Sequence, residues 1–168
     1  GNLGRAHDIE TILGAIATVE QENTAQGSPR VVWLFIGGGA QLATLRREAE
    51  ARGLSSLRFE AYQQRERLAE SLSVADVHLV SLRPELEGLI VPSKVYGIAA
   101  AGRPAIFIGD RHGEIATLLA AHGCGVTVDI GDSAGLARAV LELAANREIC
   151  GEMGARGRAA LLSNYDVS

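Results

Sequence analysis

The sequence predicts an α/β protein of the doubly wound, Rossmann-like type, in which helices cover both faces of a mainly parallel sheet. Short apolar segments rich in β-branched residues alternate along most of the chain with segments of helical periodicity. One of them, residues 31–36 (VVWLFI), is apolar throughout, as expected of a strand that is covered on both faces. Glycine-rich or polar segments follow the strands, at the edge where open parallel sheets bind ligands.

Each expected helix has apolar residues three or four positions apart, which places them on one face. In chain order these faces are Ile9, Ile12, Leu13 and Ile16; Leu42, Leu45 and Ala49; Val95, Ile98 and Ala99; Ile115, Leu118 and Leu119; and Leu136, Val140 and Leu143, before a last helix over residues 147–163. The strands expected between the helices are residues 57–60, 77–81, 105–108 and 125–128, and residues 20–29 are the one clear polar loop. Together they fit one domain over residues 1–168.

The first residues, Gly1-Asn2-Leu3-Gly4, have the composition of a turn between a strand and a helix, yet no strand precedes them. A parallel-sheet domain normally has one at that place. We therefore expect the chain to be cut from a longer polypeptide just after its first strand. An open sheet edge left in this way can pair with another chain.

Composition excludes several classes of protein. The chain has 168 residues, 47% of them hydrophobic and 21% charged, which suits a packed core. Its 16 Lys and Arg residues are scattered and its net charge is −4, so nucleic acid is not an expected partner. No apolar run reaches the ~18 residues of a membrane span, and no signal peptide is recognised. The two cysteines, Cys124 and Cys150, cannot build a disulfide framework, so we expect core thiols in a cytoplasmic protein.

Three consecutive glycines, Gly37, Gly38 and Gly39, stand between the apolar strand and the next helix. They let the backbone approach a ligand, and they leave the first amides of the helix free to hold a phosphate. The alternative is a tight turn with no ligand. One glycine would serve such a turn, so the pattern favours phosphate or diphosphate binding.

The segment 86–97 (LEGLIVPSKVYG) contains the most unusual cation of the chain. Pro92 is expected to be the first residue of a helix that has no charge from residue 95 to 102, and we expect this helix to be buried along its length. Lys94 lies in its first turn, where the helix dipole disfavours positive charge. A bound anion would remove that conflict; the alternative is a lysine in solvent or paired with Glu85 or Glu87. Glu87 could accept hydrogen bonds from sugar hydroxyls or be a solvated acid.

Residues 109–114 (GDRHGE) are a further polar loop, with Glu114 in the first turn of the next helix, where an acid is favourable with or without a ligand. The four histidines have no metal-ligand spacing, and no Asp-x-Asp chelating motif is present. No metal site is therefore expected.

Four motifs of this chain occur in the order found in one enzyme family. They are residues 1–7 (GNLGRAH), the glycine loop 37–39 after its strand, residues 87–94 (EGLIVPSK), and residues 100–104 (AAGRP) before a strand. On these motifs the chain resembles the C-terminal domain of retaining, GT-B-fold glycosyltransferases of family 4, of the bacterial capsule, O-antigen and colanic-acid type. The resemblance covers nearly the whole length and ends in residues 153–165.

The resemblance implies a nucleoside diphosphate sugar as substrate, no cofactor, and an N-terminal acceptor domain that this chain does not contain. The residues that it assigns to donor binding are Gly4, Arg5, Gly37, Gly38, Gly39 and Ser93, with Tyr62 and Gln63 near the base. Lys94 and Glu87 would act on the diphosphate and the donor sugar. The family's second acid, which commonly holds the ribose, aligns with Gly97 and is absent; Glu114 is a candidate substitute.

Other functions remain open at this level. Gly37-x-Gly39 after a strand, with Glu60 ending the next strand, resembles a dinucleotide fingerprint, although Leu42 replaces its third glycine. An NAD-dependent oxidoreductase is therefore one alternative. A nucleotide-sugar epimerase of the same fold and a catalytically inactive regulatory domain are the others.

Overall fold

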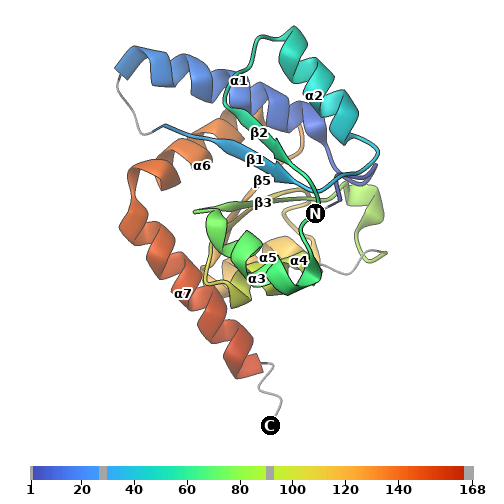
Figure 1. Ribbon diagram of the computed structural model, residues 1–168. Helices are drawn as coiled ribbons and strands as arrows, with labels where there is room; N and C mark the ends of the chain where they lie inside the picture. Colours follow the sequence, from blue (N-terminus) through green and yellow to red (C-terminus); the bar gives the residue numbers. More distant parts are fainter. Residues whose placement is uncertain (1, 27–29, 90–92, 165–168) are drawn as a thin grey trace.

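The computed structural model describes residues 2–26, 30–89 and 93–164 (Figure 1). The strands form two hydrogen-bonded groups. Strands β1 (Trp33–Ile36) and β2 (Leu57–Glu60) pair in one, and β3 (His78–Ser81), β4 (Ala105–Ile108) and β5 (Gly125–Val128) pair in that order in the other. Every pair is parallel. The predicted α/β class with a parallel, doubly wound arrangement is confirmed.

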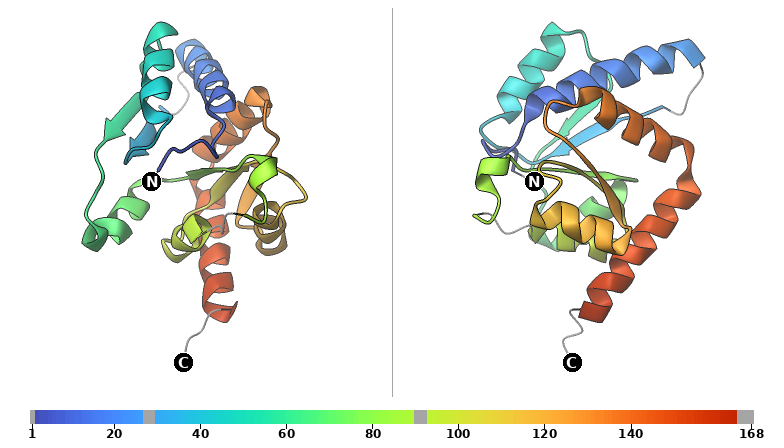
Figure 2. Two further views of the ribbon diagram at one scale, coloured as in Figure 1. Left: turned by 90° about the vertical axis from the view of Figure 1, so that its right-hand side faces the viewer. Right: turned by 180° about the vertical axis from the view of Figure 1, so that it is seen from behind.

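Helices alternate with the strands up to α6, which α7 follows directly. They are α1 (Ile9–Gln26), α2 (Leu42–Ala51), α3 (Leu68–Val74), α4 (Ser93–Ala100), α5 (Glu114–His122), α6 (Ser133–Ala145) and α7 (Arg147–Asn164), with short 3-10 turns at Arg65–Arg67 and Pro84–Leu86. In Figure 2, α1 and α6 lie on one side of the β3–β4–β5 group, and α4 and α5 lie on the other. No helix among the described residues is both long and apolar enough to cross a membrane.

Strand β4 is the centre of the core, and all of its residues are at most 1% exposed. Ile106 and Ile108 belong to the apolar cluster built by α1, α6 and β1. Ala105 and Phe107, on the opposite face, belong to the cluster built by α4 and α5. This alternation is what a strand with helices on both faces requires.

Strand β1 departs from the expectation that both its faces are covered. Trp33 is 5% exposed, whereas Val32 and Leu34, on the other face, are 49% and 37% exposed. Phe35 stacks on its register partner Phe59, with ring centroids 5.5 Å apart. One face of this strand therefore packs into the apolar cluster to which α1 and α2 contribute, and the other face is open to solvent at Val32 and Leu34.

Two further expectations are wrong. Residues 20–26 are not a loop, since α1 continues to Gln26. Helix α4 is not buried along its length: Val95 and Ile98 are buried, but Lys94 and Ala100 are exposed, because small uncharged residues can face solvent at little cost.

Other boundaries shift by a few residues or less. The first strand begins at Trp33, the last helix ends at Asn164, and Pro92 lies outside the described residues. Cys124 is buried and Cys150 partly buried, both as free thiols.

Candidate functional site

The first turn of the chain lies between the ends of β1 and β3. Asn2 forms an isolated parallel bridge with Gly38, and the amide of Leu3 donates to the Gly38 carbonyl at 2.7 Å. On the other side, the amide of Asp8 donates to the hydroxyl of Ser81, the last residue of β3, at 3.1 Å. Residues 2–4 of the first turn and the loop 37–39, predicted separately as ligand loops, are therefore in contact.

Glycine is required in this contact. Gly39 has a φ of +125°, which disfavours any side chain, and a methyl group added there would lie 2.5 Å from the backbone nitrogen of Leu3. A methyl group on Gly38 would lie 3.0 Å from the ring of Tyr62. The loop is thus bordered by the first turn on one side and by Tyr62, which is 63% exposed, on the other.

The amides of the glycine loop are only partly available to a ligand. Gly37 donates to the carbonyl of Glu60, Gln41 to that of Leu3, and Leu42 to that of Gly39, at 2.9, 3.0 and 3.2 Å. Within the described part of the chain, the amides of Gly39 and Ala40 have no acceptor. The expectation that the first amides of the helix are free is therefore wrong for Gln41 and Leu42.

Lys94, the only lysine of the sequence, reaches this same place. Its Nζ lies 3.4 Å from the carbonyl oxygen of Asn2. Burial of the amino group lowers its pKa, although the side chain as a whole remains exposed. Among the described residues no carboxylate lies within 4.0 Å of it, so the alternative pairing with Glu85 or Glu87 is not found.

His7 is a member of the site that the sequence did not indicate. Its Nδ1 lies 2.8 Å from the Ser81 carbonyl and its Nε2 3.0 Å from the Asn2 carbonyl. Burial, and then the charge of Lys94, lower its pKa, while the two hydrogen bonds oppose the shift. A neutral imidazole donates from one nitrogen only, so it can satisfy one of these two carbonyls at a time. An anion beside His7 and Lys94 would favour the protonated ring, which satisfies both.

Gln41 fixes the first turn from the side of α2. Its Nε2 donates to the carbonyls of Gly4 and His7, at 3.0 and 2.9 Å. This side chain also escaped the sequence analysis. A glutamine that follows three glycines was a possible signal, since it is the first residue there with a side chain able to reach across the loop.

Glu87 follows the 3-10 turn Pro84–Leu86, and its carboxylate lies beside the start of α5. Its Oε1 is buried and has no hydrogen-bond donor among the described residues. A methyl group added to Gly113, the N-cap residue of α5, would lie 2.6 Å from the carboxyl carbon of Glu87. The carboxylate therefore rests directly on the glycine that precedes the helix.

The remaining predicted site residues do not contact the first turn, the glycine loop or Lys94 through any described hydrogen bond or ion pair. Arg5, Ser93 and Glu114 are exposed. Gln63 donates to the nearby Ala61 carbonyl at 3.1 Å, within its own loop. A methyl group at Gly97 would lie 3.3 Å from Leu72 of α3, so an acid at this position would face an apolar side chain.

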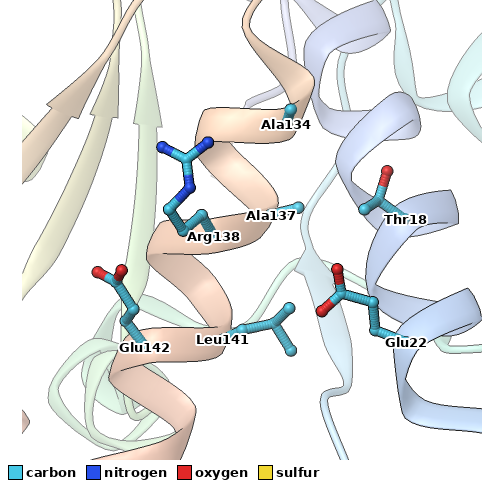
Figure 3. Close-up of a pocket in the computed structure, with 7 residues that line it drawn as sticks. All are labelled: Thr18, Glu22, Ala134, Ala137, Arg138, Leu141 and Glu142. Atoms are coloured by element: carbon cyan, nitrogen blue, oxygen red, sulfur yellow. The ribbon is translucent and has the colours of Figure 1, made fainter. Parts of the chain in front are cut away.

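A surface pocket of about 320 Å³ lies elsewhere, between α1 and α6 (Figure 3). Leu141 and Glu22 point toward each other across it, whereas Arg138 and Glu142 turn away from α1. None of the predicted site residues lines this pocket. The loops at the strand ends, not this groove, remain the candidate site.

Comparison with known proteins places these observations in a family. Residues 1–146 match the family described as "Glycosyl transferases group 1". A Pseudomonas aeruginosa protein named "Probable glycosyltransferase WbjE" is 34% identical over 172 residues, which cover 98% of this chain and 39% of that protein. The chain thus spans about two fifths of the length of this relative.

Two solved structures have the same fold. TarM of S. aureus, solved as a mutant in complex with fondaparinux, alpha-GlcNAc-glycerol and UDP, matches with a TM-score of 0.79 at 15% identity, over 98% of this chain and 31% of that one. Anabaena HepE in complex with UDP-glucose matches with a TM-score of 0.74 at 17% identity, over 98% of this chain and 43% of that one. At these identities the likeness supports the fold.

Proposed function

This chain belongs to the family of group 1 glycosyl transferases, and we propose that it is the donor-binding domain of a longer enzyme that transfers a hexose from a nucleoside diphosphate sugar. The proposed enzyme is a retaining, metal-independent member of family 4 that builds a bacterial capsule, O-antigen or colanic-acid type polysaccharide. Its acceptor is bound by a second, N-terminal domain. The catalytic step needs no cofactor.

The observation that carries this proposal is the convergence of two glycine-containing loops and one ammonium. The Asn2 backbone contacts Gly38 on one side and accepts from Lys94 on the other. Nε2 of His7 lies within hydrogen-bonding distance of the same Asn2 carbonyl. Two groups that carry or can gain positive charge thus stand together with no described acid to neutralise them. A diphosphate supplies the missing negative charge, and its oxygens can accept hydrogen bonds from the amides of Gly39 and Ala40.

The chemistry of transfer fits this arrangement. The bond between the anomeric carbon and the diphosphate breaks and its electron pair goes to the diphosphate. The oxygen of the acceptor hydroxyl forms the new bond to the anomeric carbon, and its proton goes to the departing diphosphate. Negative charge grows on the leaving group, where Lys94 and the preorganised amides stabilise it; one such donor is typically worth about 3–4 kcal/mol. Arg5, exposed on the first turn, is the second cation that can close on the diphosphate.

The other assignments follow from position. Glu87, whose Oε1 is covered by the protein, accepts from a hydroxyl of the donor sugar through Oε2. Tyr62 borders the glycine loop and packs against the base, with Gln63 beside it through its backbone. Ser93 at the start of α4 adds a hydroxyl to the donor site, and Glu114 at the start of α5 takes the ribose in place of the acid missing at Gly97.

Titration of the chain tests the proposal. HepE was solved with UDP-glucose, so UDP is the first probe, with GDP and dTDP beside it. Because Lys94 is the only lysine, selective labelling of lysine gives a single side-chain NMR signal at the centre of the site. We expect weak calorimetric binding of one nucleotide and a shift of that signal.

Two variants sharpen the test. Lys94→Ala should lose nucleotide binding, while Arg138→Ala, at the pocket between α1 and α6, should keep it. Absence of heat and of any signal shift with all three nucleotides would refute the proposal. Equal binding by Lys94→Ala and the native chain would remove Lys94 from the site.

A further inference from the structure

The carboxylate of Glu87 occupies the space that a side chain at position 113 would take. A methyl group added to Gly113 would meet three atoms within 4 Å as its nearest neighbours, and all three belong to Glu87: Oε1, the carboxyl carbon at 2.6 Å and Oε2 at 2.9 Å. Among the described residues, no other part of the fold lies as close to that position. The carboxylate of Glu87 can therefore lie where it does only because residue 113 has no side chain.

The backbone at Gly113 does not itself need glycine. Its φ of −71° and ψ of 169° are extended values that alanine adopts readily. Bonds that do not involve Glu87 hold the loop: the Asp110 side chain accepts from the His112 amide at 2.9 Å, and the Asp110 carbonyl accepts from the Gly113 amide at 3.1 Å. The Thr117 hydroxyl donates to the Gly113 carbonyl at 2.9 Å. A methyl group would therefore move the flexible end of Glu87 before it moved the loop.

Oε1 of Glu87 is buried and has no donor among the described residues. Because the protein covers Oε1, a ligand hydroxyl can reach this carboxylate only at Oε2. We propose that Gly113 is a positioning residue: by leaving room for Oε1 of Glu87 at the start of α5, it directs the other carboxylate oxygen, Oε2, toward a hydroxyl of the donor sugar. This inference rests on the proposed function and adds to it the residue that determines where the sugar-binding acid lies.

The test compares the sugar-bearing nucleotide with the nucleotide alone. Affinities for UDP-glucose and UDP are measured by calorimetry for the native chain, Gly113→Ala, Glu87→Ala and the double variant, with the GDP-mannose/GDP and dTDP-glucose/dTDP pairs substituted if the chain prefers another base. The control is Gly151→Ala, where a new methyl group meets nothing within 4 Å. Thermal unfolding of each variant confirms that it is folded.

We expect Gly113→Ala to bind the nucleotide alone as the native chain does and to bind the nucleotide sugar about tenfold more weakly, the usual effect of losing one hydrogen bond to a charged group. Glu87→Ala should show the same selective loss, and the double variant no more than Glu87→Ala alone. A selective loss in Glu87→Ala with none in Gly113→Ala overturns the inference and leaves the proposed function standing. Absence of binding by the native chain with every pair overturns the proposed function instead.

A measurement without ligand tests the inference about Gly113 independently of the proposed function. The side-chain carboxyl resonance of Glu87, assigned by its disappearance in Glu87→Gln, should shift in Gly113→Ala and stay in place in Gly151→Ala. An unmoved resonance in Gly113→Ala would show that the methyl group is accommodated without displacing Glu87, and the inference would then be wrong whatever the nucleotides do.

Discussion

The packing of α7 against the segment that follows α4 depends on Gly154, and Gly154→Ala tests it. Gly154 is buried, and a methyl group there would meet the Gly102 carbonyl, lying 2.6 Å from the Gly102 carbonyl carbon and 3.1 Å from the Arg103 nitrogen. These are backbone atoms, which cannot rotate away. Gly102 lies within residues 101–104, which connect α4 to β4, so this contact fixes the helix that carries Lys94.

The magnitude follows from the overlap. Carbon atoms pack favourably at about 3.5–4.0 Å, so α7 must move by about 1 Å to accept the methyl group at 2.6 Å. Overpacking of this kind costs ~1–3 kcal/mol, while replacing a glycine inside a helix by alanine gains about 1 kcal/mol. Because the colliding atoms are backbone atoms, we expect a cost near the upper end of that range, so that Gly154→Ala is less stable than the native chain by about 2 kcal/mol.

Gly151→Ala in the same helix provides the matched control. Its methyl group would meet nothing within 4 Å, so only the gain in helix propensity remains, up to about 1 kcal/mol. Urea unfolding followed by circular dichroism measures both variants; the midpoint should fall for Gly154→Ala and rise for Gly151→Ala, at an unchanged denaturant slope. A Gly154→Ala midpoint at or above the native value would refute the packing argument.

Three other outcomes are expected. Burial lowers the pKa of His7 and of His78, so the unfolded chain binds protons more readily than the folded chain. The free energy of unfolding should be highest above the ordinary histidine pKa of about 6.5 and should fall as the pH decreases below it. A urea midpoint that stays constant from neutral to mildly acidic pH would contradict this. The pKa of Lys94, read from its single NMR signal, should be below that of free lysine and should rise when a nucleotide binds, and a value unchanged by the nucleotide would argue against contact. Gly39→Ala should strain a φ of +125° and push Asn2 away, so nucleotide affinity should fall in calorimetry; unaltered affinity would exclude this loop from the site.

Much of the fold was predictable because burial and helical spacing leave a pattern in the chain. The strands at 57–60, 105–108 and 125–128 were predicted with the bounds that the structure shows. The meeting of the first turn with the glycine loop was also predictable, since carboxyl ends of parallel strands lie at one edge of a sheet. Both predictions depend on local sequence and on topology alone.

The details of the site were less predictable because they depend on individual side-chain contacts. His7 stands in the first turn, but its two carbonyl partners, at Asn2 and Ser81, are set by packing of residues distant in sequence. The contact between Glu87 and Gly113 likewise joins two loops with no common motif. The exposed end of helix α4 was not predictable from its lack of charge, because alanine tolerates solvent well.

The central strand β4 has a consequence for how such a domain can diversify. Its four side chains are divided between two apolar layers and leave almost no surface. A change of volume on either face would have to be absorbed by helices on that side, so this strand is a poor place for adaptation. New ligand preferences would arise instead in the loops at the strand ends, where exposed residues such as Tyr62, Gln63 and Arg111 can vary while the scaffold beneath them keeps its shape.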